Sequence, residues 1–474
     1  MSNRAKFLLL FVMMDLLLVV VVLWWFFGAM LSGSAEPEKI GREAPTVEGN
    51  ASDGENPTAP SGWPNLFGPR HDSISTETGL VFEWPEAGPP VLWRREVDDA
   101  FSAPVLADDR LILFQRRGDE EVVECADPET GQSRWEFAYP CTYQTKYPDH
   151  GDASGPKSTP LIDGDRVYAL GIEGMLHCLK LDDGSLLWQR PLNKQFEVES
   201  LLYGVGASPL VDDDRLIINV GGEKTNAGVV ALDKLTGETL WTATDQPAAY
   251  ATPTPATIHG KRYVFVLTDR GLVSLDPSSG KVHWSIDFRA KNPERVNATS
   301  PLVLGDKVLI SAFAVGSLCV RVMPDGSYKE LWFERRGLDS QYNNLLSIDG
   351  YVYGFSALEA RNSFRCLDMA TGKVQWKYPS KLAHGLSLAV EGHFILVGEH
   401  GHLVSMRIDP GRPLTVSATP EPILPSPCMI APALHRGRLY LRNRFTLLCL
   451  DLTGKQTAAE LIATAEGTPS KPGR

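Results

Sequence analysis

The chain has 474 residues, and its 58 acidic and 46 basic side chains give a formal net charge of -12 at pH 7. Nucleic acid and anionic membrane surfaces are therefore poor partners, because like charges repel and no run of Lys or Arg offsets the imbalance. About 400 residues lie between the terminal segments described below, which is too many for one ordinary domain and suits a repeat architecture.

The first 31 residues predict a membrane helix. An apolar run of 25 residues from Phe7 to Leu31 is broken only by Asp15, and such a helix spans about 37 Å, more than the ~30 Å of a bilayer core. Basic residues precede the run and acidic residues follow it, which places the N-terminus in the cytoplasm and the rest of the chain on the periplasmic or other extracytoplasmic side. A cleaved signal peptide, cut near Gly33–Ala35, is the alternative, although its apolar region is usually only about 7–15 residues. We therefore expect residues 1–31 to be an uncleaved signal anchor.

The segments on either side of the repeats have no apolar periodicity. Residues 32–62 are rich in Gly, Pro, Ser, Ala and Glu, a composition that predicts a flexible linker. Residues 457–474 predict a disordered tail. The folded part of the chain is therefore expected to be residues 63–456.

One pattern recurs through residues 63–456. It consists of a strand that begins with Pro, a turn with Asp or Gly, a second strand, and a third strand that ends in Asp-x-x-Thr-Gly-x-x-x-Trp. The clearest copies end at Trp135, Trp241, Trp284 and Trp376. The first-strand prolines from Pro104 to Pro301 are 56, 49, 46 and 46 residues apart, and the next 131 residues, to Pro432, fit three units of about 44. Eight units of this period predict an all-β, eight-bladed β-propeller with four-stranded antiparallel blades, preceded by the single N-terminal transmembrane helix.

The last unit is incomplete. It runs from Cys449 to Gly454 and stops before any Trp, whereas Trp93 lies before the first complete unit and has no blade of its own. We predict that the Trp93 strand completes the last blade and closes the ring, which removes the free edges of an open array. In each unit the Asp should accept turn N–H groups, the Gly should take a positive φ, and the Trp should pack between blades.

The seven cysteines show no CxxC spacing, so c-type haem attachment and zinc ribbons are not indicated. Five of them, Cys125, Cys178, Cys319, Cys366 and Cys449, share one position of the repeat. Ala and Ser occupy the same position in other units. The cysteines are therefore interpreted as small core residues and not as metal or redox ligands.

The repeat resembles that of the pyrroloquinoline-quinone-like (PQQ-like) β-propeller proteins over roughly residues 62–455. The run Gly62–Asp72, with Trp84-Pro85 after it, looks like a lead-in segment of some members. One branch of this family is the propeller component of the outer-membrane β-barrel assembly machine, a non-enzymatic scaffold, and another comprises quinoprotein alcohol and sugar dehydrogenases. The resemblance implies the fold, whereas the motif itself encodes blade packing and carries no chemistry.

A quinoprotein dehydrogenase would need a calcium cage of oxygen ligands, a catalytic carboxylate and stacking surfaces for the quinone. The chain lacks the adjacent cysteine pair that many such enzymes carry, and it is short for the insertions that cover their active site. We therefore assign no catalytic residue or metal ligand and expect no cofactor. PQQ with calcium belongs to the alternative interpretation, a PQQ-dependent dehydrogenase.

The sequence favours a non-catalytic envelope scaffold or ligand-binding propeller, monomeric and anchored by its N-terminal helix. Its partners would be envelope proteins or a peptide or glycan ligand. An extracytoplasmic sensor is a further alternative, but a cytoplasmic tail of about six residues offers no signalling output.

The loops that lead into the first strand of each blade should gather at one mouth of the central channel. Their aromatic and amide side chains suit recognition of a peptide or glycan, and the alternative is that they tie neighbouring blades together by hydrogen bonds. The candidate residues are Phe101, Ser102, Ser158, Tyr203, Tyr250, Asn297, Tyr342, Asn343, His384 and Arg442.

Two weaker candidates lie elsewhere. An insertion at residues 139–157 contains Asp149, His150 and Asp152 and could be a lid, a metal loop or an ordinary solvated loop. His400 and His402 could share one strand face, although no carboxylate spacing completes a site around them.

Overall fold

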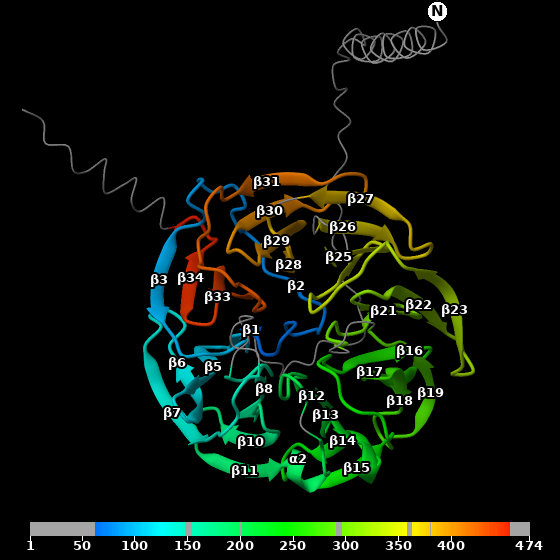
Figure 1. Cartoon of the computed structure of the whole chain (residues 1–474). Coiled ribbons are helices and arrows are strands. Elements are labelled where there is room, and N and C mark those ends of the chain that lie inside the picture. Colours follow the sequence, from blue (N-terminus) through cyan, green and yellow to red (C-terminus); the bar gives the residue numbers. More distant parts are fainter. Residues whose placement is uncertain are drawn as a thin grey trace, which may run out of the picture. The chain divides into compact units, whose positions relative to one another are not determined.

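The computed structural model describes residues 62–146, 154–199, 201–290, 296–357, 363–379 and 381–455. These ranges all belong to one structural unit, residues 46–474. Within them, eight antiparallel sheets form a ring around a central channel (Figure 1). Six sheets have four strands, and two carry a fifth short strand from the N-terminal part of the chain. The predicted all-β propeller of eight four-stranded blades is confirmed.

The predicted membrane helix at residues 1–31 and the predicted tail at residues 457–474 lie outside the described residues. The predicted linker also lies outside them, except for Gly62. Among the residues that the structure does describe, no helix is long and apolar enough to cross a membrane.

Each blade runs from an inner strand at the channel to an outer strand at the rim (Figure 1). Blades 1 and 2 contain β4 (Val105–Ala107), β5 (Arg110–Arg117), β6 (Glu120–Ala126), β7 (Ser133–Pro140), β8 (Leu161–Asp163), β9 (Arg166–Leu170), β10 (Met175–Lys180) and β11 (Leu186–Pro191). Blades 3 and 4 contain β12 (Leu210–Asp212), β13 (Arg215–Gly222), β14 (Ala227–Asp233), β15 (Thr239–Ala243), β16 (Thr254–Ile258), β17 (Lys261–Leu267), β18 (Gly271–Leu275) and β19 (Val282–Asp287).

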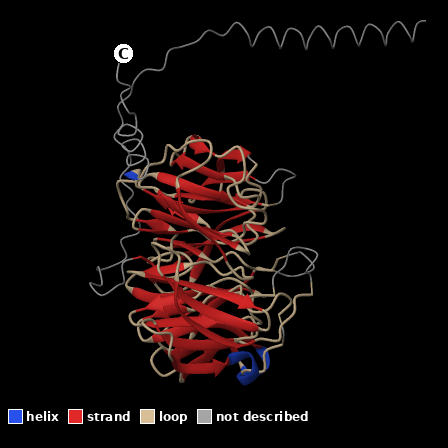
Figure 2. Ribbon diagram, turned by 90° about the vertical axis from the view of Figure 1, so that its left-hand side faces the viewer, coloured by secondary structure: helices blue, strands red, loops and turns tan. Residues whose placement is uncertain are grey.

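Blades 5 and 6 contain β20 (Leu302–Leu304), β21 (Lys307–Ala312), β22 (Gly316–Val322), β23 (Tyr328–Glu334), β24 (Leu346–Ile348), β25 (Tyr351–Ser356), β26 (Ser363–Asp368) and β27 (Val374–Pro379). Blades 7 and 8 contain β28 (Gly385–Val390), β29 (His393–Gly398), β30 (Leu403–Arg407), β31 (Leu414–Ala418), β32 (Ala433–His435), β33 (Arg438–Arg442) and β34 (Thr446–Asp451). Two short helices, α2 (Leu192–Gln195) and η2 (Glu223–Thr225), accompany blades 2 and 3. From the side, the described part is almost entirely strand and loop (Figure 2).

The hydrophobic core is divided among the seams where neighbouring sheets face each other. Between blades 1 and 2, for example, Phe114 and Val123 pack in one buried cluster with Val167 and Ala169. The outer strand β7 alternates half-buried and exposed residues, as expected of a strand with one face on the core and one in water. Each blade is therefore stabilised by the sheets on both sides, and the ring must close to cover its first and last sheets.

The Trp of the repeat joins each blade to the next. Trp135 of blade 1 lies over Gly184 of blade 2, and its indole N–H donates to the Leu181 carbonyl at 3.0 Å. Five more indole groups donate to a carbonyl in the turn of the next blade: Trp93 to Pro128, Trp241 to Pro277, Trp284 to Gly326, Trp332 to Met369 and Trp376 to Asp409. The turns have the expected form, since Asp127 accepts from the N–H groups of Glu129 and Thr130.

Replacing the turn glycine under a Trp is expected to separate two blades. A Cβ atom at Gly184 would lie 2.4 Å from the Trp135 ring, and the backbone φ is +72°. Gly184→Ala should therefore lower the free energy of unfolding by about 3 kcal/mol through overpacking and backbone strain. Gly164 is the matched control in the same blade, because it has a φ of +57° but nothing within 4 Å of an added Cβ. Gly164→Ala should cost only about 1 kcal/mol, and equal losses in urea denaturation would contradict the docking role.

Five cysteines lie opposite the docking residue of their blade. The register pairs Cys125 with Trp135, Cys178 with Trp188, Cys319 with Trp332, Cys366 with Trp376 and Cys449 with Trp93. All seven cysteines are buried free thiols, and burial raises the pKa of Cys178, for example, to about 11. A buried, protonated thiol is a poor nucleophile or ligand, which agrees with a packing role.

The ring closes through the strand that precedes blade 1. β3 (Val91–Glu96) pairs antiparallel with β34 as the outer strand of blade 8, and Trp93 lies opposite Cys449. Trp93 then docks onto blade 1 in the same way as the other tryptophans, against Gly131. The closure predicted from the missing eighth Trp is therefore found.

The seam between blades 7 and 8 is built differently. In blade 7, Ser417 lies opposite Ser405 at the register position where other blades have Trp. Residues 76–90, which we name the seam segment, fill this place. The Val81 N–H donates to the Leu452 carbonyl at 2.7 Å, which is the turn carbonyl that receives an indole in other seams, and Val81 lies against Gly454. The N-terminal part of the chain thus replaces the docking Trp that blade 7 lacks.

Residues 62–75, which we name the channel segment, run inside the ring. β1 (Gly62–Trp63) pairs antiparallel with the inner strand β4 of blade 1, and β2 (Ile74–Ser75) pairs parallel with the inner strand β28 of blade 7. The chain between these two short strands crosses the centre of the ring (Figure 1). The sequence did not predict this course.

Candidate functional site

A cavity of about 560 Å³ lies at the mouth of the channel where the chain enters the inner strands. All eight blades and the channel segment contribute to its wall, so it is centred on the axis of the ring. Its lining residues are Leu66, Phe67, Phe101, Lys157, Thr159, Tyr203, Gly206, Tyr250, Thr252, Val296, Ala298, Ser300, Gln341, Tyr342, Asn343, Leu386, Glu399, Pro427, Met429 and Ala431.

The ten predicted residues divide into three sets. The lining of the cavity includes Phe101, Tyr203, Tyr250, Tyr342 and Asn343. His384 lies behind the wall, where its ring meets the Tyr342 ring edge-on at 5.8 Å. The other four, which are almost completely buried, are Ser102, Ser158, Asn297 and Arg442. Whether any of the ten binds a ligand stays a prediction.

Hydrogen bonds between blades also occur at this mouth, as the alternative interpretation proposed. Backbone N–H groups donate to a hydroxyl of the next blade in a chain from Ala103 to Thr159, from Thr159 to Ser208, from Ser208 to Thr252 and from Thr252 to Ser300. Among the ten predicted residues, Asn297 donates to the Thr268 and Phe288 carbonyls. Arg442 donates to the Asp98 carbonyl at 2.9 Å. These bonds fix the loops, and the aromatic residues between them face the cavity.

The wall carries one charge of each sign. Glu399 accepts from His384 Nδ1 at 3.2 Å, and this hydrogen bond lowers the pKa of the Glu399 carboxyl group. Lys157 lies 5.8 Å from the centre of the Tyr143 ring, within range of a cation–π contact. Tyr203 and Tyr250 form an aromatic pair with ring centres 6.0 Å apart. The cavity is therefore mainly aromatic and apolar, with a few fixed polar groups.

Two neighbouring polar atoms of the wall are buried without a hydrogen-bond partner among the described residues. They are the hydroxyl oxygen of Tyr342 and the Oδ1 atom of Asn343. The Asn343 side-chain amide already donates to the Gly385 carbonyl, which leaves Oδ1 as an acceptor. Burial raises the pKa of Tyr342, so its hydroxyl keeps its proton and is a donor. Such unsatisfied groups are uncommon in folded proteins.

Sequence reasoning missed several lining residues for identifiable reasons. Leu66 and Phe67 belong to the lead-in segment that was noticed only as a family feature. Lys157 directly precedes the predicted Ser158. The loop was therefore identified, but the residue of the loop whose side chain lines the cavity was not. Glu399 follows β29 and belongs to a second set of loops, between the middle strands, that the sequence argument did not consider.

The two weaker candidates do not add to the site. Asp149, His150 and Asp152 lie outside the described residues. His400 bonds to the Ser426 hydroxyl, whereas His402 bonds to the Thr419 carbonyl, so the two rings have separate environments.

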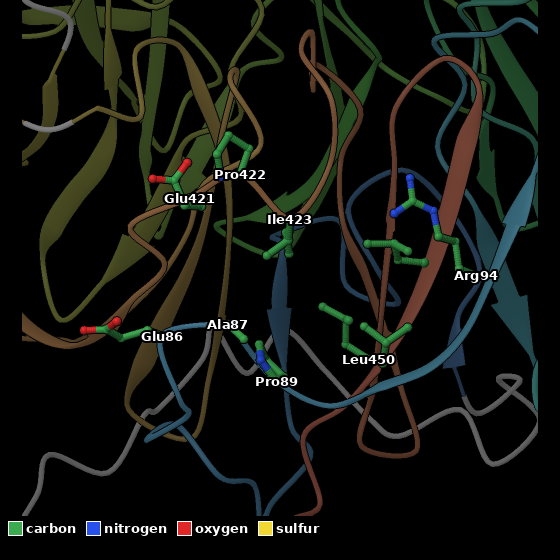
Figure 3. Close-up of a pocket in the computed structure, with 10 residues that line it drawn as sticks. Glu86, Ala87, Pro89, Arg94, Glu421, Pro422, Ile423 and Leu450 are labelled. Atoms are coloured by element: carbon green, nitrogen blue, oxygen red, sulfur yellow. The ribbon is translucent and has the colours of Figure 1, made fainter.

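A smaller pocket of about 250 Å³ lies at the seam of blades 7 and 8. Ile423 and Leu450 form part of its apolar wall, with Glu86 and Glu421 on one side and Arg94 on the other (Figure 3). None of the ten predicted residues lines it.

The cavity does not fit a quinone with calcium. Calcium takes six to eight oxygen ligands, usually including several carboxylates. Among the residues that the structure describes, the lining contains one carboxylate, Glu399, and that group is paired with His384. We therefore derive no redox step at this site.

Comparison with known proteins identifies relatives. A family model described as "Outer membrane protein assembly factor BamB" matches residues 118–378. The outer membrane protein assembly factor BamB of Yersinia pestis is 23% identical over 298 residues, which cover 59% of this chain and 70% of that protein. The protein of the same name from Legionella pneumophila (strain Paris) is 30% identical over 173 residues, or 34% of this chain and 40% of that protein.

Solved structures share the fold. BamB from Moraxella catarrhalis has a TM-score of 0.54 at 16% identity, covering 76% of this chain and 97% of that one. Quinohemoprotein alcohol dehydrogenase from Comamonas testosteroni has a TM-score of 0.57 at 12% identity, covering 87% and 82%. Because these identities are low, the two likenesses support the PQQ-like propeller fold and do not separate scaffold from enzyme. The family match extends over more than half of the chain, and the chain therefore belongs to the outer membrane protein assembly factor BamB family.

Proposed function

We propose that this protein is a non-catalytic envelope scaffold that binds a protein partner at the central cavity and contributes to outer-membrane protein assembly. The cavity is the observation that carries the proposal, because seven of the eight blades bring aromatic or apolar side chains to one mouth, and blade 2 adds Lys157 and Thr159. Such a concave, mainly apolar site with a few fixed polar groups is typical of ligand recognition. Membership of the family supports the assembly role.

The wider setting is part of the same proposal. The N-terminal segment would anchor the chain in a membrane with the propeller on the extracytoplasmic side, where envelope proteins are available as partners. A binding role is favoured over a dehydrogenase because the cavity wall offers one paired carboxylate and no set of oxygen ligands suited to calcium.

Photo-crosslinking in cell envelopes tests the proposal. A benzophenone amino acid replaces Phe101 in the cavity wall of the full chain, and the matched control places it at Leu235, which is 55% exposed on a turn between β14 and β15. We expect position 101 to give a discrete adduct that mass spectrometry identifies as a component of outer-membrane assembly, with no such adduct at position 235. Identical adduct patterns at the two positions, or none at position 101, would overturn the proposed function.

A further inference from the structure

The channel segment forms part of the cavity. It crosses the ring between β1 and β2 (Figure 1), and its residues Leu66 and Phe67 belong to the cavity wall. Trp63 of the same segment is only 2% exposed and packs in the core with Leu106 and Leu111 of blade 1. A ligand that enters from the mouth therefore meets a segment that is fixed to the ring.

The composition of the wall favours side chains of a polypeptide over sugars. Apolar groups such as Leu386, Pro427 and Met429 lie beside the aromatic rings, and the described part of the lining has one carboxylate and one ammonium group. A glycan presents many hydroxyl groups, each of which would need a polar partner in place of water. An aromatic or large apolar side chain would bury its surface here without such a loss.

The two buried polar atoms without partners also favour a polypeptide as the ligand. Tyr342 offers a hydroxyl donor and the adjacent Asn343 offers an amide oxygen acceptor, both buried and without partners among the described residues. Asn343 is completely buried, and both residues belong to the cavity lining. One donor and one acceptor on consecutive residues match the carbonyl and N–H groups of a peptide backbone.

We propose that the cavity receives one aromatic or large apolar side chain of a partner polypeptide together with the backbone beside it. The Tyr342 hydroxyl donates to a carbonyl of that backbone, and Asn343 Oδ1 accepts from an N–H group. This inference rests on the proposed function, since it names the part of the partner that the scaffold recognises. It makes the cavity a socket for a protruding residue.

The first experiment measures binding of N-acetylphenylalaninamide, which carries one aromatic ring between two peptide groups, to the full chain in detergent micelles. A ligand of this size should bind with a dissociation constant on the order of 1 mM, measured by ligand-observed NMR. Two comparison probes are N-acetylglycinamide, which lacks the ring, and chitotriose, a glycan. We expect binding of the phenylalanine derivative and none of the other two at the same concentrations.

Tyr342→Phe separates a binding role from a structural one. Because the hydroxyl of Tyr342 has no partner in the described part of the fold, its removal should leave the melting temperature unchanged or slightly raised. The affinity for N-acetylphenylalaninamide should fall about fivefold, the effect of losing one ordinary hydrogen bond. Tyr353→Phe is the matched control, since Tyr353 also has a buried hydroxyl without a partner but packs in the core of blade 6.

The outcomes separate this inference from the proposed function. Equal affinity of the Tyr342→Phe variant and the wild type, binding of chitotriose, or no binding of the phenylalanine derivative would each overturn the inference. Crosslinks from position 101 would still support the proposed function in those cases, with the partner resting on the mouth without inserting a residue. Binding of the probe without any envelope crosslink would contradict the scaffold role and leave a small-molecule socket.

Discussion

Deletion of residues 62–90 is expected to open the ring and to lower the free energy of unfolding by about 5 kcal/mol or more. The deletion removes three buried hydrophobic side chains, those of Trp63, Ile74 and Phe82, and burial of a side chain of this size contributes about 1.5–3 kcal/mol. It keeps β3, so blade 8 retains its outer strand. Urea denaturation of the full chain and of the variant measures the difference.

A deletion of similar kind in the preceding linker provides the control. Removal of residues 46–61, which the sequence predicts to be flexible, should leave the unfolding midpoint unchanged. If the deletion of residues 62–90 also left the midpoint unchanged, blades 7 and 8 would pack together without help. That result would contradict the role assigned to the seam segment.

The contacts of the seam segment explain why so large an effect is expected. Glu77 accepts from the N–H groups of Arg436 and Gly437 in blade 8. Glu391 of blade 7 accepts from the N–H groups of Gly79 and Leu80. The Glu77 carboxylate of the segment therefore binds blade 8, and the Glu391 carboxylate of blade 7 binds the segment. The seam of blades 1 and 2, by contrast, has an indole that donates to the turn of the next blade, so the joint of blades 7 and 8 uses more chain in the place of one Trp.

The blades could be predicted from the sequence because their signal is local and repeated. The Asp-x-x-Thr-Gly-x-x-x-Trp pattern specifies a turn and a docking residue within about ten positions. Trp93 could be assigned to blade 8 because it belongs to no other unit and the last unit lacks a Trp. The seam segment could not be predicted, because blade 7 has Ser417 where the motif requires Trp. Val81 replaces the indole donor with its backbone N–H group, and a backbone group leaves no signal in the sequence. The channel segment was missed because β1 and β2 are two residues long, and tertiary packing decides such short strands.

The site was predicted in part for a related reason. The loops at the mouth were identified correctly as a set, but neighbouring residues within a loop face different sides. Phe101 lines the cavity whereas Ser102 is buried, and Lys157 lines it whereas Ser158 is buried. That alternation depends on the register of each loop against the next blade, which composition does not reveal. Glu399 was missed because it comes from a different loop of its blade.

The second large effect concerns Glu121, a carboxylic acid between blades 1 and 2. It is 1% exposed and accepts from the Tyr139 hydroxyl at 2.6 Å and from the Ile172 N–H at 3.0 Å. Burial raises its pKa from the ordinary 4.5 to about 7, while the bond from Tyr139 and the charge of Arg116 oppose that rise and the charge of Glu173 adds to it.

The nearby imidazole has the opposite effect in this range. His177 packs on the Tyr139 ring at 4.1 Å between centres, and burial lowers the pKa of His177 from the ordinary 6.5 to about 4. Between these two values the unfolded chain holds the His177 proton and the folded chain does not, so this residue makes stability rise with pH. The contribution of Glu121 must therefore be measured against a variant that lacks its carboxyl group.

The contribution of Glu121 to stability should fall as the pH rises from about 4.5 to about 7. In this window the unfolded chain loses the Glu121 proton and the folded chain keeps it, so this group makes the free energy of unfolding decrease with pH. The shift corresponds to about 3 kcal/mol, a contribution that is complete below pH 4.5 and absent above pH 7. Urea denaturation of the wild type and of a Glu121→Gln variant at pH 5 and pH 8 measures this contribution as the difference between the two chains.

Two variants test the assignment in opposite directions. Glu121→Gln cannot ionise, so the change in its free energy of unfolding from pH 5 to pH 8 should be more positive than that of the wild type by about 3 kcal/mol. Tyr139→Phe removes the hydroxyl that stabilises the ionised carboxylate, so the pKa of Glu121 should rise further and the change should be more negative. If both variants followed the wild-type profile, the titrating group would lie elsewhere. A more positive change in the first and a more negative change in the second would show that a single buried proton links blades 1 and 2.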